Sequence, residues 1–377
     1  MPETSMRLAV MGHYPPNRPP SGGIETVMVN LVAALARREH LDLHVVQHRQ
    51  VAAAGTFSMP GFTLHNLPAA NRRLLPNIAQ TQRLARAWLQ QVQPDAVISH
   101  HPSFALAAND VGIPVVHTIH GMPRQEFWTR QGAFARSASA LEIWLEWRML
   151  RQARHIIAIA DQVQELYASR TRARFHRVNN PIADLFFEPA GPPQPHQALL
   201  IGHLNKRKGI DVAIRAVAQV LPDYPDFVLN IIGRTDADPE YAQRVQALAA
   251  PLGHAIQFLG VTDQSGIRAA MERAQFFLLS SRMETAPMVI AEAMAVGRPV
   301  ISTTVGGVAN MVEPGVTGYL APTEDAAALA QAMRRLLADP AHARALGANA
   351  ARFARQHYHP DAVADGYLRA VTAAMRT

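Results

Sequence analysis

The sequence predicts an α/β protein with two Rossmann-like domains, each built on a doubly wound parallel sheet. Two observations support this prediction. Strand-like apolar runs alternate with helical patterns in two successive series, and a proline-rich stretch, PAGPPQPHQ, separates the series at residues 189–197. A chain of 377 residues that is 49% hydrophobic can also form two cores. We therefore expect two domains with a cleft between them, joined by a linker at 189–197.

The first series predicts an N-terminal domain over residues 1–188. Helical patterns occupy about 25–38 and 81–92. The strand-like runs that alternate with such patterns are RLAVMG, LDLHVVQ, DAVISH, PVVHTIH and HIIAIA. This order predicts a parallel sheet with helices as the connections between strands.

The second series predicts a C-terminal domain over residues 198–356. Helices are expected after Gly209 and after Pro239. The strand-like runs are QALLIGHL, FVLNIIG, IQFLG, AQFFLLS, PVISTTV and GYLAP. The closing residues, 357–377, have a helical pattern as well.

Composition excludes several classes of protein and site. The absence of cysteine excludes disulfides, thiolate catalysis and thiolate metal sites. The short apolar run at Leu8–Met11 is typical of a first strand rather than of a signal peptide, and no run approaches the ~18 apolar residues that a membrane span needs. We expect a cytoplasmic protein, with contact at the inner face of the cell membrane as an open alternative.

Positive charge is concentrated in the first half of the chain. Residues 1–190 contain 19 arginines, no lysine and 13 acidic residues, and so carry +6 of the total charge of +7. Such a field attracts anionic lipid headgroups, polyphosphate-linked acceptors or nucleic acid. Nucleic acid is disfavoured because no recognised binding motif accompanies the charge.

A pair of glutamates in the C-terminal half gives the strongest indication of chemistry. Glu284 and Glu292 lie in SSRMETAPMVIAEAMAVG, where a helix should start near Pro287 and end at Gly297. Backbone amides at its start lack intrahelical partners and could hold a diphosphate; they belong to Thr285, Ala286, Met288 and Val289. Carboxylates on both sides of that site would suit the hydroxyls of a nucleotide-sugar. The alternative is an ordinary solvated glutamate pair.

The residues after this pair extend the pattern. They read EAMAVGRPVISTTVGG, through Gly306 and Gly307, and continue into EPGVTGYLAPTED. The whole segment resembles the signature of retaining glycosyltransferases of family four, in which seven residues separate the two glutamates. The resemblance implies the GT-B fold, with the last helix, 357–377, crossing back onto the N-terminal domain.

The same resemblance implies the activity and the roles of the glutamates. A hexosyl group would move, with retained anomeric configuration, from a nucleotide-diphosphate sugar to a glycan or lipid-linked acceptor. Glu284 would bind sugar hydroxyls and Glu292 the ribose. No metal and no separate cofactor are expected.

The only two lysines of the chain, Lys206 and Lys208, lie in the loop IGHLNKRKGI. A compact ammonium can contact diphosphate oxygens where a guanidinium does not fit. Members of the resembled family usually carry GRxxxxKG here, with the Arg and the Lys on the donor diphosphate. Lys208 matches, but His203 replaces the Arg, so either His203 or Arg207 could take its role. A solvated basic loop is the alternative.

Glycines also mark the two domains. Gly22 and Gly23, in PPSGGIETVMVNL, would let backbone amides approach the donor diphosphate and the acceptor, although the pair could be only a turn. Gly233, at the end of a strand-like run, is expected to belong to the donor-binding site. The chain has no GxxxxGK[ST], and no GxGxxG follows the first strand, which disfavours NTPase and dehydrogenase readings.

Histidines should lie at the carboxyl edge of the N-terminal sheet, where ligands bind in this class of fold. His120 ends the run PVVHTIH, and the resemblance implies that it contacts the transferred sugar. His100 and His101 end another run and are weaker candidates for acceptor contact. A structural or solvated histidine is the alternative.

Two further stretches resemble functional motifs. Asp236 and Asp238 imitate a DxD metal motif, but Pro239 follows, so Asp238 is expected to be a helix N-cap. Trp144 and Trp147 lie three apart in a basic helical stretch that also contains Arg136, Arg148 and Arg151. We expect this helix to pack its Trp face on the N-terminal sheet, and a membrane-surface helix is the alternative.

The sequence therefore predicts a glycosyltransferase with His120, Lys208 and Glu284 as its catalytic residues. A role in bacterial cell-surface polysaccharide or glycolipid synthesis is expected. Its partners would be the nucleotide-sugar donor, a glycan or lipid-linked acceptor and an anionic membrane surface, without nucleic acid. Other enzymes of the same fold, such as an epimerase, and a non-catalytic nucleotide-sugar-binding subunit are the alternatives.

Overall fold

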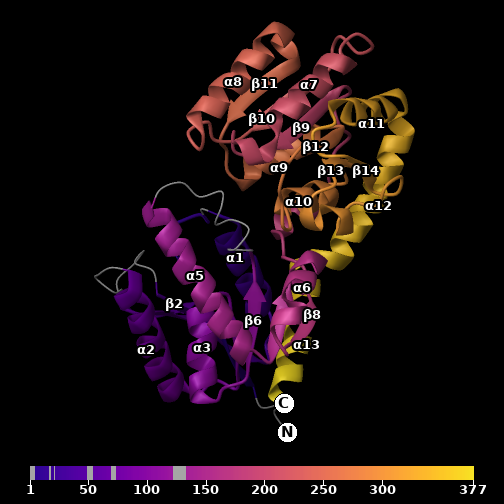
Figure 1. The fold of residues 1–377 in the computed structure, drawn as a ribbon. Helices are drawn as coiled ribbons and strands as arrows, with labels where there is room; N and C mark the ends of the chain where they lie inside the picture. The colour runs from indigo at the N-terminus through magenta and orange to yellow at the C-terminus, as the bar shows by residue number, and fades with distance from the viewer. Residues whose placement is uncertain (1–4, 17, 21, 49–53, 69–73, 122–132) are drawn as a thin grey trace. The chain divides into compact units, whose positions relative to one another are not determined.

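The chain forms two compact units in the computed structural model (Figure 1), which describes residues 5–16, 18–20, 22–48, 54–68, 74–121 and 133–377. Unit 1 comprises Met1–Pro181 and Pro360–Thr377, and unit 2 comprises Ile182–His359. Each unit contains one sheet with helices, as the alternating patterns predict. In the described residues, no helix is both long and apolar enough to cross a membrane.

Unit 1 has an eight-stranded sheet in the order β3-β4-β2-β1-β5-β6-β7-β8. The strands are β1 (Met6–Met11), β2 (Leu41–Gln47), β3 (Gly55–Met59), β4 (Phe62–Asn66), β5 (Ala96–Ser99), β6 (Val115–Ile119), β7 (His155–Ala158) and β8 (Arg174–Arg177). All neighbours pair in parallel except β3, which forms an antiparallel hairpin with β4 at the sheet edge. The sequence patterns did not predict β3, β4 or β8.

In unit 1, every described helix except α13 connects two of these strands. The described helices are α1 (Gly23–Ala36), α2 (Leu74–Val92), α3 (Pro102–Val111), α5 (Ala133–Gln152), α6 (Asp161–Tyr167) and α13 (Pro360–Met375). The last of these belongs to unit 1 although it ends the chain, which confirms the predicted return of the final helix. Arg37 and Arg38, which directly follow α1, pair with Asp361 and Asp365 of α13, each at 2.8 Å.

Helix α5 corrects one prediction. Trp144 and Trp147 are 47% and 51% exposed, whereas Leu145 and Met149 are buried. The Trp face therefore does not pack on the sheet. The side chain of Arg136, which the sequence placed in the same basic stretch, lies outside the described residues.

Unit 2 has a six-stranded parallel sheet in the order β11-β10-β9-β12-β13-β14. Its strands are β9 (Gln197–Ile201), β10 (Val228–Ile232), β11 (Ile256–Gly260), β12 (Phe276–Leu279), β13 (Val300–Thr303) and β14 (Gly318–Ala321). Its helices are α7 (Ile210–Val220), α8 (Pro239–Ala249), α9 (Gln264–Arg273), α10 (Met288–Ala295), α11 (Ala326–Ala338) and α12 (Pro340–His357). Every one of these strands coincides with a predicted run.

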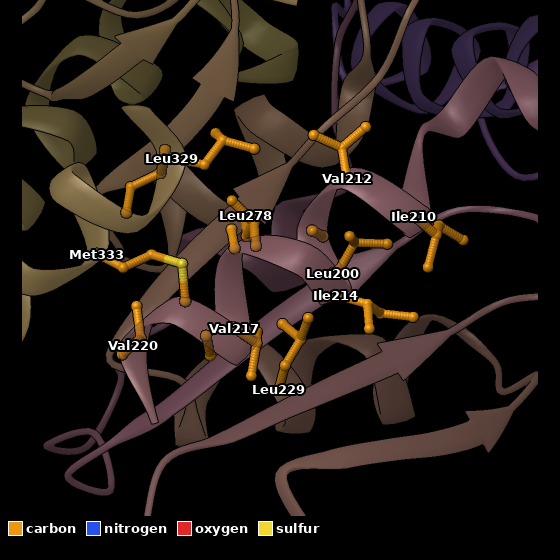
Figure 2. Close-up of a cluster of buried hydrophobic side chains, with 14 of the residues drawn as sticks. Leu200, Ile210, Val212, Ile214, Val217, Val220, Leu229, Leu278, Leu329 and Met333 are labelled. Carbon is orange, nitrogen blue, oxygen red and sulfur yellow. The ribbon is translucent and has the colours of Figure 1, made fainter. Parts of the chain in front are cut away.

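The sheet of unit 2 is covered on both faces, because its strands are apolar on both sides. In β9, Leu200 faces a cluster with α7, α8 and α11, and the adjacent Leu199 faces a cluster with α9, α10 and α12. Figure 2 shows the first cluster, where Val217 and Met333 meet Leu229 and Leu278. This three-layer core fixes where the loops at the carboxyl ends of the strands lie.

The predicted linker is wrong. The units meet in sequence between Pro181 and Ile182, so that residues 189–197 lie within unit 2. Arg298 donates to the carbonyl of Gly191 (2.8 Å), whose amide donates to Glu272 (2.6 Å). These contacts hold the proline-rich stretch against unit 2 as an ordered part of it.

Candidate functional site

Both sheets reverse their strand order at a point that the candidate residues flank. In unit 2 the reversal lies between β9 and β12, and in unit 1 it lies between β1 and β5. The loops that follow strands on either side of such a reversal diverge and leave room for a ligand. In unit 2 these loops carry Lys208 and Glu284, and in unit 1 the loop after β5 carries His100 and His101.

The loop after β9 is held in a defined shape. Asn205 caps a short 3-10 turn, Lys206–Lys208, by accepting from the Lys208 amide (3.2 Å). The turn ends at Gly209, whose φ of 60° is left-handed. A Cβ on Gly209 would come within 2.1 Å of the Ser280 carbonyl, so only glycine lets the loops after β9 and β12 approach this closely.

Glu284 is the centre of the charged group in unit 2. Its buried carboxylate accepts from Lys208 Nζ (2.6 Å) and from Ser281 Oγ (2.8 Å) through one oxygen, and from Arg207 Nη1 (3.3 Å) through the other. Lys208 is largely covered, whereas Arg207 is 46% exposed. The two cations and the carboxylate therefore share one place, and the ammonium and guanidinium keep further donors for a second anion.

Arg282 holds the Lys206–Lys208 turn in place through hydrogen bonds to its backbone. Its amide donates to the Arg207 carbonyl (2.7 Å), and its guanidinium donates to the Lys206 carbonyl (2.7 Å) and to both Asp211 oxygens (3.0 and 2.9 Å). Burial opposes ionisation of Asp211, but hydrogen bonds from Arg282 and Tyr241 outweigh it and lower the pKa of Asp211 to about 2. Sequence reasoning missed this network.

Helix α10 begins beside Glu284. Pro287 is its N-cap, with φ of −70° and ψ of 111°, and Met288 is the first helical residue, one position later than predicted. Four backbone amides donate to no partner within the described residues, namely those of Thr285, Ala286, Met288 and Val289. They lie at the positive end of the helix dipole and form a candidate anion site.

The other end of α10 confirms the predicted stop. Gly297 has a φ of 79°, and its amide donates to Met294 O (2.9 Å) while the Arg298 amide donates to Ala293 O (2.9 Å). This pair of bonds is the Schellman arrangement, which favours glycine. The helix between its two ends carries Glu292 on the second turn.

Glu292 is buried without a polar partner in the described part of the chain. Burial, which disfavours the charged form, raises its pKa to about 7. With a pKa of about 7, this side chain would be stabilised as a carboxylate if the hydroxyls of a ligand donated hydrogen bonds to it.

The other positions that the sequence singled out in unit 2 are His203, Gly233, Asp236 and Asp238. His203 is exposed, and partial desolvation together with the charge of Lys208 lowers its pKa. A Cβ on Gly233 would meet the Gly202 carbonyl at 1.9 Å, so close packing alone requires this glycine. Asp238 caps α8 by accepting from the Tyr241 amide (3.1 Å), as predicted, and Asp236 pairs with Arg234 (2.7 Å).

The unit 1 edge is lined by neutral histidines. His100 Nδ1 and His120 Nε2 lie 2.6 Å apart with stacked rings, and His117 contacts Ser99 Oγ (3.3 Å) in the adjacent strand. Burial lowers the pKa of His120 to about 4 and that of His117 to about 3, and it lowers the pKa of His100 well below its usual range. These rings can therefore accept and donate hydrogen bonds at neutral pH without carrying charge.

The final helix supports this edge. Tyr367 of α13 is buried, its ring lies 6.0 Å from that of His100, and its hydroxyl contacts Thr118 Oγ1 (3.2 Å). His101 caps α3 by accepting from the Ser103 amide (3.2 Å). That bond supports a structural role for His101.

Gly22 and Gly23 stand at the start of α1 in the same unit. Gly22 is its N-cap, in an extended conformation that any residue can adopt. A Cβ on either glycine would meet nothing within 4 Å. Nothing in the described fold explains the pair, which is consistent with the predicted approach of a ligand.

Two protein-family models match this chain. A model of the Glycosyl transferases group 1 family matches residues 182–353, and a model of Glycosyltransferase Family 4 matches residues 21–184. Glycogen synthase of Mycobacterium tuberculosis is 31% identical over 293 residues. The match covers 73% of this chain and 66% of that protein, so the chain spans slightly less than two thirds of its relative.

The chain belongs to glycosyltransferase family 4. Solved structures establish the GT-B fold of this family member. Sucrose-phosphate synthase from Thermosynechococcus elongatus superposes with a TM-score of 0.75 at 24% identity, over 98% of this chain and 100% of that one. The Anabaena protein HepE, solved with UDP and glucose, gives a TM-score of 0.72 at 18% identity, over 98% and 100%.

The family 4 chain thus brings together most of the residues that its sequence singled out. Unit 2 unites Lys208, Arg207, Glu284 and the four amides, and unit 1 unites His100 with His120. Sequence reasoning missed Arg282 and Tyr367. The only signal for Arg282 was its position two residues before Glu284, and Tyr367 gave none.

Proposed function

We propose that this chain is a retaining glycosyltransferase that moves a hexosyl group from a nucleoside diphosphate sugar to a glycan or lipid-linked acceptor. The observation that supports it best is the convergence of Lys208, Arg207 and four unpaired amides around Glu284. Cations and amides arranged in advance stabilise the negative charge that develops on a departing diphosphate. The UDP and glucose in the Anabaena structure make UDP-glucose the first donor to test.

Each candidate then has a role. Arg207, rather than His203, takes the place of the family's missing arginine, because its guanidinium lies at Glu284 whereas a lowered pKa leaves His203 mostly neutral. Glu284 accepts hydrogen bonds from the sugar and Glu292 from the ribose. His120 contacts the sugar as a neutral ring. Gly22 and Gly23 leave room for the donor or acceptor.

A donor screen tests this proposal. The protein would be incubated with UDP- and GDP-hexoses and with glycan or lipid-linked acceptors, with release of nucleotide as the signal and NMR of the product as the assay of anomeric configuration. We expect release of nucleotide that depends on the acceptor, and a product linkage with the same anomeric configuration as the donor. An epimerase would convert the donor without acceptor, and a non-catalytic subunit would bind nucleotide without turnover; either result contradicts the proposal.

The same assay tests metal independence. In the described residues, no group of three His, Asp or Glu side chains could hold a metal ion, and Asp236 and Asp238 are both engaged in the fold. We propose that the diphosphate charge is balanced by Lys208, Arg207 and the amides. Full turnover in excess EDTA is expected, and activity that depends on added Mn²⁺ or Mg²⁺ would contradict it.

A further inference from the structure

Helix α5 presents two large aromatic side chains to solvent. Trp144, Trp147, Arg148 and Arg151 follow the spacing i, i+3, i+4, i+7 and so form one stripe, which we name the Trp–Arg face. About half of each Trp surface is exposed. A contiguous exposed apolar patch, unlike a single exposed side chain, marks a contact surface.

The fold of unit 1 does not depend on this stripe. The opposite side of α5 supplies the buried residues Leu145, Met149 and Leu150. Glu146 on that side accepts from the hydroxyl of Tyr167 in α6 (2.8 Å). The tryptophans are thus additional to the packing that holds α5 in place.

Each tryptophan is paired with an arginine four residues later. The Arg151 guanidinium lies 4.7 Å from the centre of the Trp147 ring, and that of Arg148 lies 5.8 Å from the Trp144 ring. Stacking leaves the edge of a guanidinium free to bind a phosphate in a bidentate manner. The Trp–Arg face therefore presents apolar rings next to hydrogen-bond donors that can bind phosphate.

More arginines adjoin the C-terminal end of α5. Thr171 donates to the Leu150 carbonyl (2.6 Å), and the Arg174 amide donates to the Arg154 carbonyl (2.7 Å), so that the exposed Arg170, Arg172 and Arg174 follow beside the helix end. Acidic neighbours offset little of this charge: Glu146 is buried and Asp161 pairs with Arg177 (2.7 Å). Glu142 and Glu165 are the exposed acids nearest in sequence.

We propose that the Trp–Arg face docks unit 1 on anionic lipid bilayers. Amphipathic tryptophan rings settle at the boundary between headgroups and acyl chains, and arginines beside them bind headgroup phosphates. A helix face that combines both, in the half of the chain that carries nearly all the net charge, complements an anionic bilayer. The proposal is independent of the donor reaction, because it concerns residues apart from the transferase site.

Vesicle flotation of the full chain tests it. The wild-type protein should float with phosphatidylglycerol-containing vesicles at low salt and not with pure phosphatidylcholine vesicles, and binding should weaken as salt screens the charges. Trp144→Ala/Trp147→Ala and Arg148→Glu/Arg151→Glu should each lower the partition constant about tenfold or more. All four residues are solvent-facing or partly so, and circular dichroism would verify folding.

A matched control separates this face from general charge. Arg244→Glu/Arg344→Glu makes the same charge change at exposed positions of α8 and α12 in unit 2 and should lower the partition constant no more than about twofold. Equal loss in both charge variants would overturn the proposal, as would absence of wild-type flotation at low salt. If the tryptophan variant instead turns a dimer into a monomer in light scattering while vesicle binding is unchanged, a second copy of the chain occupies the face.

Discussion

The two sheets reverse their strand order at sites of opposite chemistry. In unit 2 the loops after β9 and β12 bring Lys208, Arg207 and Glu284 together as ions. In unit 1 the corresponding edge carries His100 and His120, whose low pKa values keep them uncharged near neutrality. The same topological position therefore serves charge in one unit and neutral hydrogen bonding in the other.

The difference indicates which chemical groups each unit can bind. A diphosphate requires cations and amides, which unit 2 has. A sugar or glycan offers hydroxyls, and neutral imidazoles bind them without the desolvation cost of a buried charge. Substitutions in the charged group of unit 2 should therefore change turnover and nucleotide affinity. Substitutions at the histidine edge of unit 1 should change how the stability of unit 1 depends on pH.

The largest effect is expected from Lys208→Ala. Losing the ammonium beside Glu284 removes charge that stabilises the leaving diphosphate in the transition state, so kcat should fall about 100-fold or more. Lys206→Ala, in the same loop with an exposed side chain, is the matched control and should stay within a few-fold. Folded Lys208→Ala protein with nearly wild-type kcat would remove Lys208 from the catalytic residues.

Glu292→Ala should weaken nucleotide binding about tenfold or more, because ribose contacts act in ground and transition states alike. Isothermal titration with UDP measures the affinity. Glu240→Ala, which removes an exposed glutamate of α8, controls for net charge. An unchanged affinity would assign Glu292 to the fold alone.

Arg282→Gln should lower kcat about tenfold, because it removes the guanidinium that holds the backbone of the Lys206–Lys208 turn. Arg215→Gln offers a sharp comparison, because Arg215 also pairs with Asp211 (3.0 Å) but, in the described residues, makes no hydrogen bond to that turn. If both variants lose activity equally, the Asp211 pairing matters for stability and Arg282 does not position the cations. Thermal unfolding of the two proteins would separate these outcomes.

The smallest effect is a difference in pH response. In the described part of unit 1, the histidines with a lowered pKa include His65, His100, His117, His120, His155 and His176. As pH falls below 6.5, the unfolded chain takes up protons that the folded unit cannot, so unit 1 loses stability on the way to about pH 4. The loss should be about 1 kcal/mol for each fully buried histidine between pH 7.5 and 5.5.

Unit 2 should respond less, because two groups oppose each other. The pKa of Glu292 is raised to about 7, so folded unit 2 gains stability as pH falls from 7 towards 4.5, while His203 contributes a loss. Hydrogen exchange at pH 7.5 and 5.5, corrected for intrinsic rates, would report each unit separately. Glu292→Gln should abolish the gain. A larger loss of protection in unit 2 than in unit 1 would reverse the comparison.

Much of the fold could be predicted because its signals are local. Parallel strands are continuous apolar runs, and the end of α10 at Gly297 is marked by one residue type with a left-handed preference. The candidate anion site followed from the same local reasoning. The hairpin β3-β4 was missed because β3 is mostly exposed and has no buried run to identify it.

The misses depend on distant contacts. The stretch 189–197 resembles a linker in composition, and only Arg298 and Glu272, far along the chain, show why it is ordered. Arg282 needed its partner Asp211, 71 positions away, to reveal a role. The orientation of α5 was misjudged because tryptophans and leucines alternate around the helix, so periodicity could not decide which face points inward.

Unit 2 is an insertion in unit 1, since residues 182–359 interrupt a domain whose last helix is α13. During translation, the sheet of unit 1 leaves the ribosome long before Tyr367 can reach Thr118, whereas unit 2 is complete as soon as its own segment has emerged. Its ends already meet, because the Ile182 amide donates to the Tyr358 carbonyl (3.2 Å). The order of folding should therefore run against the order of synthesis, with the second unit finishing first and the final helix closing the first.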